Sequence, residues 1–124
     1  MKILIILLML MLGTYSVAYA DQWKVTAYCA CTKCCGEQAQ GITASGKKVE
    51  VGMVACNWLP FGTRLFIDKL GMFVVEDRGA KSLFGSNDNH IKHVDVYLST
   101  HEEAKRFGVR YLDVEILEGK DGGG

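Results

Sequence analysis

An aspartate in the middle of a strand-like segment is the first candidate for chemistry in this sequence. The segment "HVDVYL" covers residues 93–98, and its alternation sets three apolar side chains against three polar ones: Val94, Val96 and Leu98 against His93, Asp95 and Tyr97. Aspartate is disfavoured in strands because its carboxylate competes for nearby backbone hydrogen bonds. Asp95, on the same strand face as a histidine and a tyrosine, therefore has two interpretations. It either has a functional role or is a solvent-exposed residue of the strand.

A cysteine cluster is the second candidate. Cys29, Cys31, Cys34 and Cys35 form the pattern C-x-C-x-x-C-C, and Cys56 is the fifth cysteine. Export, which the first residues of the chain predict, favours disulfides that staple a small core. The odd count leaves at least one thiol unpaired or intermolecular. Cys31 and Cys34 also have the C-x-x-C spacing of a zinc site, but Cys56 is the one remote cysteine, so no metal site is predicted and the pairing stays open.

The first twenty residues have the features of a secretory signal peptide. Lys2 precedes the apolar run "ILIILLMLML", and Ala18-Tyr19-Ala20 matches an A-x-A cleavage site. No cysteine follows that site directly, so we expect no lipid anchor and no stable membrane anchor after cleavage. The predicted organisation is a signal peptide at 1–20, one domain at 21–118 and a flexible C-terminal tail at 119–124. The predicted location is the cell envelope, either secreted or periplasmic.

The charge balance of the remaining chain limits its partners. After residue 20 of 124, 104 residues remain, and removing Lys2 from the 14 basic residues leaves 13 against 14 acidic ones. A nearly neutral domain without a basic stripe is not expected to bind nucleic acid. Neutral or mixed-charge substrates such as glycans fit better. A chain of this length forms one compact domain rather than two.

Six short apolar segments predict the strands that must position these residues. They cover 23–29, 51–56, 64–67, 72–76, 93–98 and 111–117. One helix is predicted between them, because Thr100 and Glu103 form a capping box and Gly108 supplies a stop. Residues 78–92 are polar and turn-rich, which predicts a surface loop. The expected fold class is all-β, and a small closed barrel and an open sandwich both fit this pattern.

The ordered motifs resemble a known family. "TAYCACTKCCG", "GITASGKKVEVGMVAC", "LPFGTRLFI", "FVVEDRGA", "HVDVYLSTHEEAKRFGVR" and "LDVEIL" follow one another as in the three-aspartate (3D) domain, over about residues 24–117. That domain is similar to the catalytic barrel of the membrane-bound lytic transglycosylase A family and, more distantly, to the barrel of expansins. The resemblance implies a six-stranded double-psi β-barrel with one short helix that acts on peptidoglycan glycan strands.

The resemblance also implies a set of site residues. Asp95 stands where the family has its catalytic aspartate, and Asp77 stands at the aspartate of "E-D-(R/T/V)-G-(A/G)". Thr43 and Ser45 match the "T-A-S-G" that lines the cleft. Asn57 stands where the family commonly has its first aspartate, which is one of two departures from the pattern. The other is a longer and more polar loop between the two remaining aspartates.

The implied activity needs one carboxyl group and no cofactor. A lytic transglycosylase protonates the glycosidic oxygen between N-acetylmuramic acid and N-acetylglucosamine, and the muramyl 6-hydroxyl then closes onto C1 as a 1,6-anhydro ring. Asp95 would act as acid and base and Asp77 would assist it. Substrate contacts are expected from Thr43, Ser45, Asn57, His93 and Tyr97, with Tyr97 stacking on a sugar ring and His93 bonding a hydroxyl.

Two other classes of function remain open. A non-catalytic, expansin-like module that binds wall glycans is the first, and Asn57 in place of an aspartate favours it. A small thiol-active or zinc-binding secreted protein is the second, and it depends on the cysteine cluster alone. The products of peptidoglycan digestion separate the first class from the enzyme.

Overall fold

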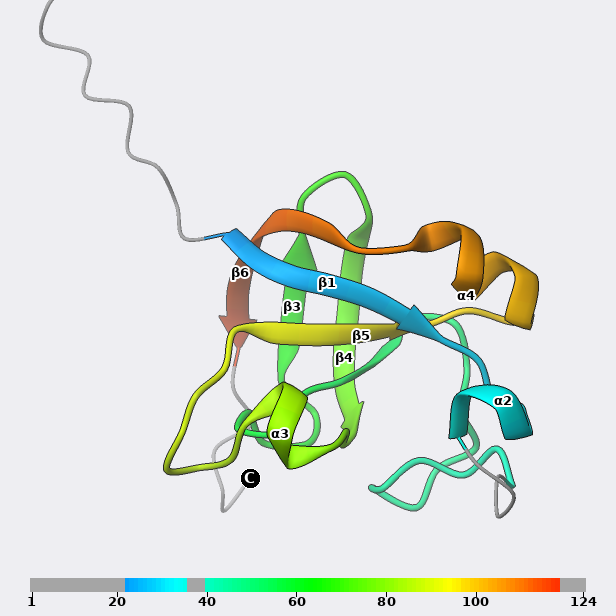
Figure 1. Cartoon of the computed structure of the whole chain (residues 1–124). Coiled ribbons are helices and arrows are strands. Elements are labelled where there is room, and N and C mark those ends of the chain that lie inside the picture. Colours follow the sequence, from blue (N-terminus) through cyan, green and yellow to red (C-terminus); the bar gives the residue numbers. More distant parts are fainter. Residues whose placement is uncertain (1–21, 36–39, 119–124) are drawn as a thin grey trace, which may run out of the picture.

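A computed structural model of the chain describes residues 22–35 and 40–118 (Figure 1). The predicted signal peptide at 1–20 and the predicted tail at 119–124 lie outside the described residues. Within the described part, no helix is long and apolar enough to cross a membrane.

Six strands form a closed barrel, and all six lie where the sequence predicts them. Their bounds are β1 Gln22–Tyr28, β2 Met53–Ala55, β3 Arg64–Ile67, β4 Gly71–Asp77, β5 His93–Tyr97 and β6 Arg110–Glu118. Their order around the barrel is β1-β5-β2-β4-β3-β6 (Figure 1). The prediction of an all-β fold with a small barrel is confirmed, and the open sandwich is not formed. Closure pairs every strand on both sides, so no sheet edge is left exposed.

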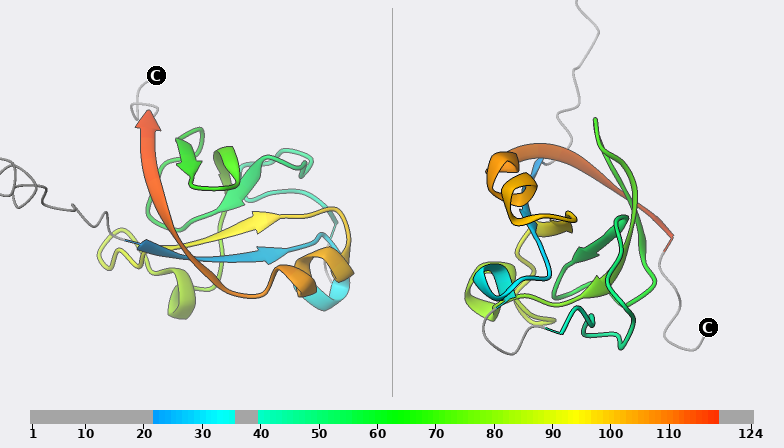
Figure 2. Two further views of the ribbon diagram at one scale, coloured as in Figure 1. Left: turned by 90° about the horizontal axis from the view of Figure 1, so that it is seen from above. Right: turned by 90° about the vertical axis from the view of Figure 1, so that its right-hand side faces the viewer.

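Strand pairing in the barrel is mixed. β1 runs parallel to β5, and β2 runs parallel to β4, whereas the other four neighbouring pairs are antiparallel. Figure 2 shows β1 and β5 side by side and pointing the same way, although about 70 residues separate them in the sequence. A parallel pair needs a long crossover connection. Here the whole segment between Tyr28 and His93, with three further strands, makes that connection.

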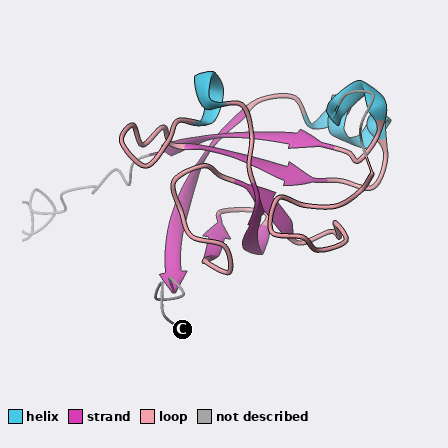
Figure 3. Ribbon diagram, turned by 90° about the horizontal axis from the view of Figure 1, so that it is seen from below, coloured by secondary structure: helices cyan, strands magenta, loops and turns pink. Residues whose placement is uncertain are grey.

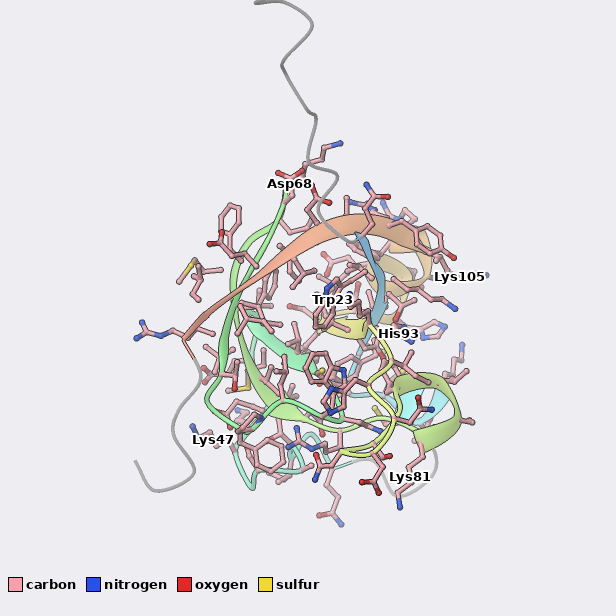
Figure 4. The ribbon with its side chains drawn as sticks, turned by 90° about the vertical axis from the view of Figure 1, so that its left-hand side faces the viewer. Trp23, Lys47, Asp68, Lys81, His93 and Lys105 are labelled. Atoms are coloured by element: carbon pink, nitrogen blue, oxygen red, sulfur yellow. The ribbon has the colours of Figure 1, made fainter. Side chains whose placement is uncertain are left out.

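The barrel interior is filled by the apolar face of each strand. The buried cluster comprises Trp23, Val25, Val54, Cys56, Leu59, Leu65, Ile67, Val75, Val94, Val96 and Leu112. Trp23 lies inside the ribbon in Figure 4, whereas the labelled Asp68, Lys81 and Lys105 lie at the outside. The alternation of "HVDVYL" predicts Val94, Val96 and Leu98 in the core. Val94 and Val96 are there, Leu98 is half-buried and outside the core cluster, and Asp95 lies on the other face.

Three short helices lie outside the barrel in the described part of the chain, whereas the sequence predicts one (Figure 3). The predicted helix is α4, His101–Phe107. Thr100 caps it by accepting a hydrogen bond from the Glu103 amide at 3.1 Å, and Gly108 ends it with a φ of 67°. The other two are α2, Thr32–Cys35, and α3, Lys81–Phe84. Each is a single turn of four residues, too short to produce a helical periodicity in the sequence.

Candidate functional site

Four residues form one row across four neighbouring strands of the barrel. Thr26 on β1 pairs with Asp95 on β5, Asp95 pairs with Ala55 on β2, and Ala55 pairs with Asp77 on β4. Adjacent strands lie about 4.8 Å apart, so the backbones of the two aspartates are separated by about 10 Å. The residue between them is Ala55, which is buried and packs against Tyr28 and Val49. We call Thr26, Asp95, Ala55 and Asp77 the four-strand row.

Asp95 is half-buried and has a strongly perturbed carboxyl group. Burial raises the pKa of Asp95 from 3.8 to about 6, because the apolar surroundings penalise the charged form. The hydroxyl of Thr26 donates to Oδ1 of Asp95 at 3.0 Å and lowers this pKa, while the charge of Asp77 raises it. Desolvation dominates, so Asp95 keeps its proton to a higher pH than an exposed aspartate does.

His93 lies on β5 two residues before Asp95, and its side chain is buried. It is only 4% exposed, and its ring stacks on Phe84 of α3 at 4.0 Å between centroids. Its Nδ1 contacts the carbonyl oxygen of Leu83 at 3.1 Å, and its Nε2 contacts the Thr26 hydroxyl at 2.8 Å. A direct hydrogen bond from His93 to a sugar hydroxyl, as the sequence predicts, does not fit this burial. His93 and Asp95 do lie on the same face of β5, but α3 covers His93.

The contacts of His93 restrict where protons can lie. The Leu83 carbonyl accepts only, so Nδ1 carries a hydrogen and donates it. Nε2 of neutral His93 is then an acceptor, so it competes with the Asp95 carboxylate for the single proton of the Thr26 hydroxyl. Desolvation lowers the pKa of His93, assisted by the charge of Lys24 and opposed by the Leu83 hydrogen bond. Burial thus favours neutral His93 and protonated Asp95, whereas the Thr26 hydrogen bond favours the Asp95 carboxylate.

Asp77 ends β4 and is held by three donors. Oδ2 accepts from the Tyr28 hydroxyl at 2.8 Å, and Oδ1 accepts from the backbone amides of Ala44 and Arg78, each at 2.9 Å. Burial raises the pKa of Tyr28, with a further contribution from the Asp77 charge, so this hydroxyl keeps its proton for donation. The orientation of the Asp77 carboxylate is therefore fixed from three sides.

Thr43 and Ser45 form a tight turn beside Asp77. The two hydroxyls lie 2.8 Å apart, and the Thr43 hydroxyl accepts from the Lys47 amide at 3.1 Å. The turn is attached to β4 because the Ser45 amide donates to the Glu76 carbonyl at 3.1 Å. Thr43 is buried and Ser45 half-buried. The part of the "TASG" motif that contacts Asp77 is the Ala44 backbone amide, and the hydroxyls of Thr43 and Ser45 hold the turn.

Asn57 is occupied by the loop that follows β4. Its Nδ2 donates to the carbonyls of Gly79 and Gly85, both at 2.9 Å, and its Oδ1 accepts from the Gly79 amide at 2.7 Å. A carboxylate could not make the first two bonds, because it has no hydrogen to donate. The amide at position 57 thus has a structural reason, and its three bonds fix the loop that carries α3.

A cavity of about 410 Å³ opens on the Asp77 side of the row. Its lining includes Tyr28, Cys35, Ile42, Ala55, Asp77 and Arg78. The volume lies in the range of ligand pockets. Asp95 is not among the lining residues and stands one strand beyond, on the other side of Ala55. Tyr97 pairs with Tyr28 across β1 and β5, and the rings meet edge to face at 5.8 Å.

Thr26 and Tyr28 were not predicted as site residues. Both lie on the polar face of the alternating segment 23–29, and β1 places them opposite Asp95 and Tyr97. The alternation was a usable signal for them. The missing information was the parallel pairing of the first and fifth strands, which local sequence does not specify.

The expected disulfides are not formed among the four cysteines whose side chains are described. No pair of them is at bonding distance, and the closest sulfurs, those of Cys29 and Cys31, are 2.7 Å apart. Cys56 is fully buried in the barrel core, where desolvation raises its thiol pKa. Cys56 therefore cannot act as the remote metal ligand for Cys31 and Cys34, because its side chain belongs to the buried cluster inside the barrel. Instead, Nδ1 of His101 approaches the sulfurs of Cys29 and Cys31.

No protein-family model matches the chain, and no curated protein matches it significantly. The resemblance to the three-aspartate domain therefore stays a prediction that depends on its motifs.

Proposed function

We propose that the chain is a secreted peptidoglycan lytic transglycosylase with Asp95 as its acid and base. The observation that supports this most directly is the half-buried Asp95 carboxyl, whose pKa is raised to about 6. A general acid works best when its pKa lies near the working pH. We further propose that the barrel is of the double-psi type. Two parallel pairs in an otherwise antiparallel six-stranded barrel support that assignment.

In the proposed reaction, Asp95 acts twice. Its proton passes to the glycosidic oxygen while the bond from the muramyl C1 to that oxygen breaks, and N-acetylglucosamine leaves with a free hydroxyl. The Asp95 carboxylate then takes the proton of the muramyl 6-hydroxyl as O6 bonds to C1. The product is the 1,6-anhydro sugar, and Asp95 regains its proton. The nucleophile belongs to the same sugar, so no second carboxylate has to activate water.

The neighbours of Asp95 support this sequence of steps. Thr26 donates to Asp95, so it stabilises the carboxylate that takes the proton of the muramyl 6-hydroxyl. His93 acts through Thr26 and is a positioning residue. Asp77 raises the pKa of Asp95 by its charge, and its fixed carboxylate faces the cavity that would hold a sugar.

Digestion of purified peptidoglycan tests the proposal. The expected products are 1,6-anhydromuramyl ends, detected by mass spectrometry, with their formation lost in Asp95→Asn. The matched control is Asp113→Asn, which removes an exposed carboxylate on β6 and should leave the activity at the wild-type level.

Two results would contradict the proposal. Reducing muramyl ends would indicate hydrolysis by activated water. Sedimentation with intact sacculi and no new ends would indicate the expansin-like binding module, a rival supported by the position of Asp95 outside the cavity lining.

A further inference from the structure

Two sulfurs and one imidazole nitrogen converge outside the barrel, away from the four-strand row. Cys29 directly follows β1, Cys31 precedes α2, and His101 is the first residue of α4. Nδ1 of His101 lies 3.8 Å from the sulfur of Cys29 and 3.6 Å from that of Cys31. All three ligand atoms lie within 4.8 Å of one another. Figures 1 and 2 show α2 and α4 at the same end of the barrel, beyond the end of β1.

From this geometry we infer a site for a divalent zinc-type metal ion held by Cys29, Cys31 and His101. Thiolate and imidazole ligands together select zinc over the hard cations calcium and magnesium, which prefer oxygen. A tetrahedral zinc with bonds of about 2.3 Å to sulfur and about 2.0 Å to nitrogen spaces a sulfur and a nitrogen ligand by about 3.6 Å. The two cysteine–histidine distances match that spacing.

The two sulfurs must separate slightly to accept the ion. Their 2.7 Å distance compares with about 3.8 Å between two thiolates on one zinc. A small rotation about the side-chain torsion of Cys31, which is only half-buried, can supply this. The thiol of Cys35 is near, since it donates to the Cys29 carbonyl at 3.1 Å, so α2 also offers a thiol for the fourth position.

Binding at this site balances charge by releasing protons. Each cysteine thiol gives up its proton to solvent, and the two thiolates offset the double charge of the ion. His101 binds through neutral Nδ1, which leaves its other ring nitrogen protonated. Affinity therefore rises with pH.

The ion would tie three separate segments together. Cys29 follows Tyr28, the donor to Asp77, and Cys35 lines the cavity beside Asp77. An ion bound here fixes the turn from β1 to α2 against α4, and with it one wall of the cavity. This inference does not depend on wall cleavage, because metal binding and activity are measured separately.

Metal content of the reduced, purified mature chain tests the inference. We expect about one zinc ion per chain and, after exchange, cobalt absorption bands from thiolate ligands. The melting temperature should rise with zinc and fall with a chelator. Cys31→Ser and His101→Ala should both lose the ion and the cobalt bands. Cys56→Ala and His90→Ala are the controls, since they remove a buried thiol and an exposed imidazole elsewhere, and both should keep the ion.

Three results would overturn the site. One is zinc content and cobalt bands that are the same in wild type, Cys31→Ser and His101→Ala. Another is a wild-type chain without bound metal after refolding with excess zinc. The last is a Cys29–Cys31 disulfide, found by thiol alkylation without reduction, in a folded chain that does not take up metal once it is reduced. His101→Ala leaves both thiols in place, so it separates loss of a ligand from loss of the fold.

Discussion

At the scale of single residues, the proton on Asp95 is the central feature. Burial and two neighbouring residues shift the pKa of Asp95 in different directions. Burial and the charge of Asp77 raise the pKa of Asp95, whereas the Thr26 hydrogen bond lowers it. In the proposed reaction Asp95 must be protonated to act as an acid, so the first step would require a pH near or below about 6, and activity should decline as the pH rises above that value.

Two substitutions should move the pKa of Asp95 in opposite directions. Thr26→Val removes the hydrogen bond to the carboxylate, so the pKa should rise above its wild-type value and the activity profile should extend to higher pH. Asp77→Asn removes a like charge, so both should move to lower pH. Carboxyl carbon NMR titration measures the pKa directly, and Asp95→Asn assigns the signal. Movement of both variants in the same direction would contradict this account of the site.

Removal of the proposed acid should have a large effect on the proposed reaction. Asp95→Asn keeps an oxygen that can accept from Thr26 but has no proton to transfer, so the rate of anhydro-product formation should fall by about 10²–10⁴. Initial rates on labelled peptidoglycan measure this. Wild-type rates in Asp95→Asn would exclude this residue as the acid.

At the scale of elements, the loop between β4 and β5 depends on Asn57. Asn57→Asp would introduce the residue that the resembling family commonly has there. It should nevertheless destabilise the chain by about 1–3 kcal/mol, because two loop carbonyls lose their donor and face a charge. Chemical denaturation measures this, with the exposed Asn87→Asp as the control. If Asn57→Asp increased both the stability and the activity, the hydrogen bonds of the Asn57 side chain would not be what stabilises the loop.

The sequence predicts the elements better than their partners. All six strands were predictable, because each carries a short apolar or alternating pattern. The single turns α2 and α3 were not, since four residues contain no repeat. The contacts that define the site come from pairs far apart in the sequence, such as Thr26 with Asp95 and Cys31 with His101. Motifs identify Asp77 and Asp95, but the register across β2 sets their spacing.

At the scale of the whole molecule, Asp95 should make stability depend on pH. Its pKa is raised on folding, so the folded chain binds a proton more tightly than the unfolded chain does. The resulting stability is fully present below about pH 3.8 and is lost as the pH rises through about 6. At neutral pH, Asp95 is therefore ionised although half-buried, and this lowers the free energy of unfolding.

Asp95→Asn should accordingly stabilise the chain at neutral pH. The asparagine fills the same space without a charge to desolvate, so the gain should be on the order of 2 kcal/mol at pH 7 and should vanish near pH 4. Unfolding followed by circular dichroism at both pH values measures it. Equal stability of the two proteins at pH 7 would mean that the Asp95 carboxylate is well solvated.

The order of strands around the barrel has a consequence for how the chain reaches its native state. β1 lies between β5 and β6, so during synthesis β1 has no barrel partner until the segment from residue 93 onward is present. Pairing between strands far apart in the sequence slows folding, because the chain loses loop-closure entropy before the stabilising contacts form. A chain stopped before residue 110 would lack β6 and leave β1 and β3 with unpaired backbone edges, which are templates for aggregation. Premature termination should therefore yield insoluble protein rather than a smaller functional barrel.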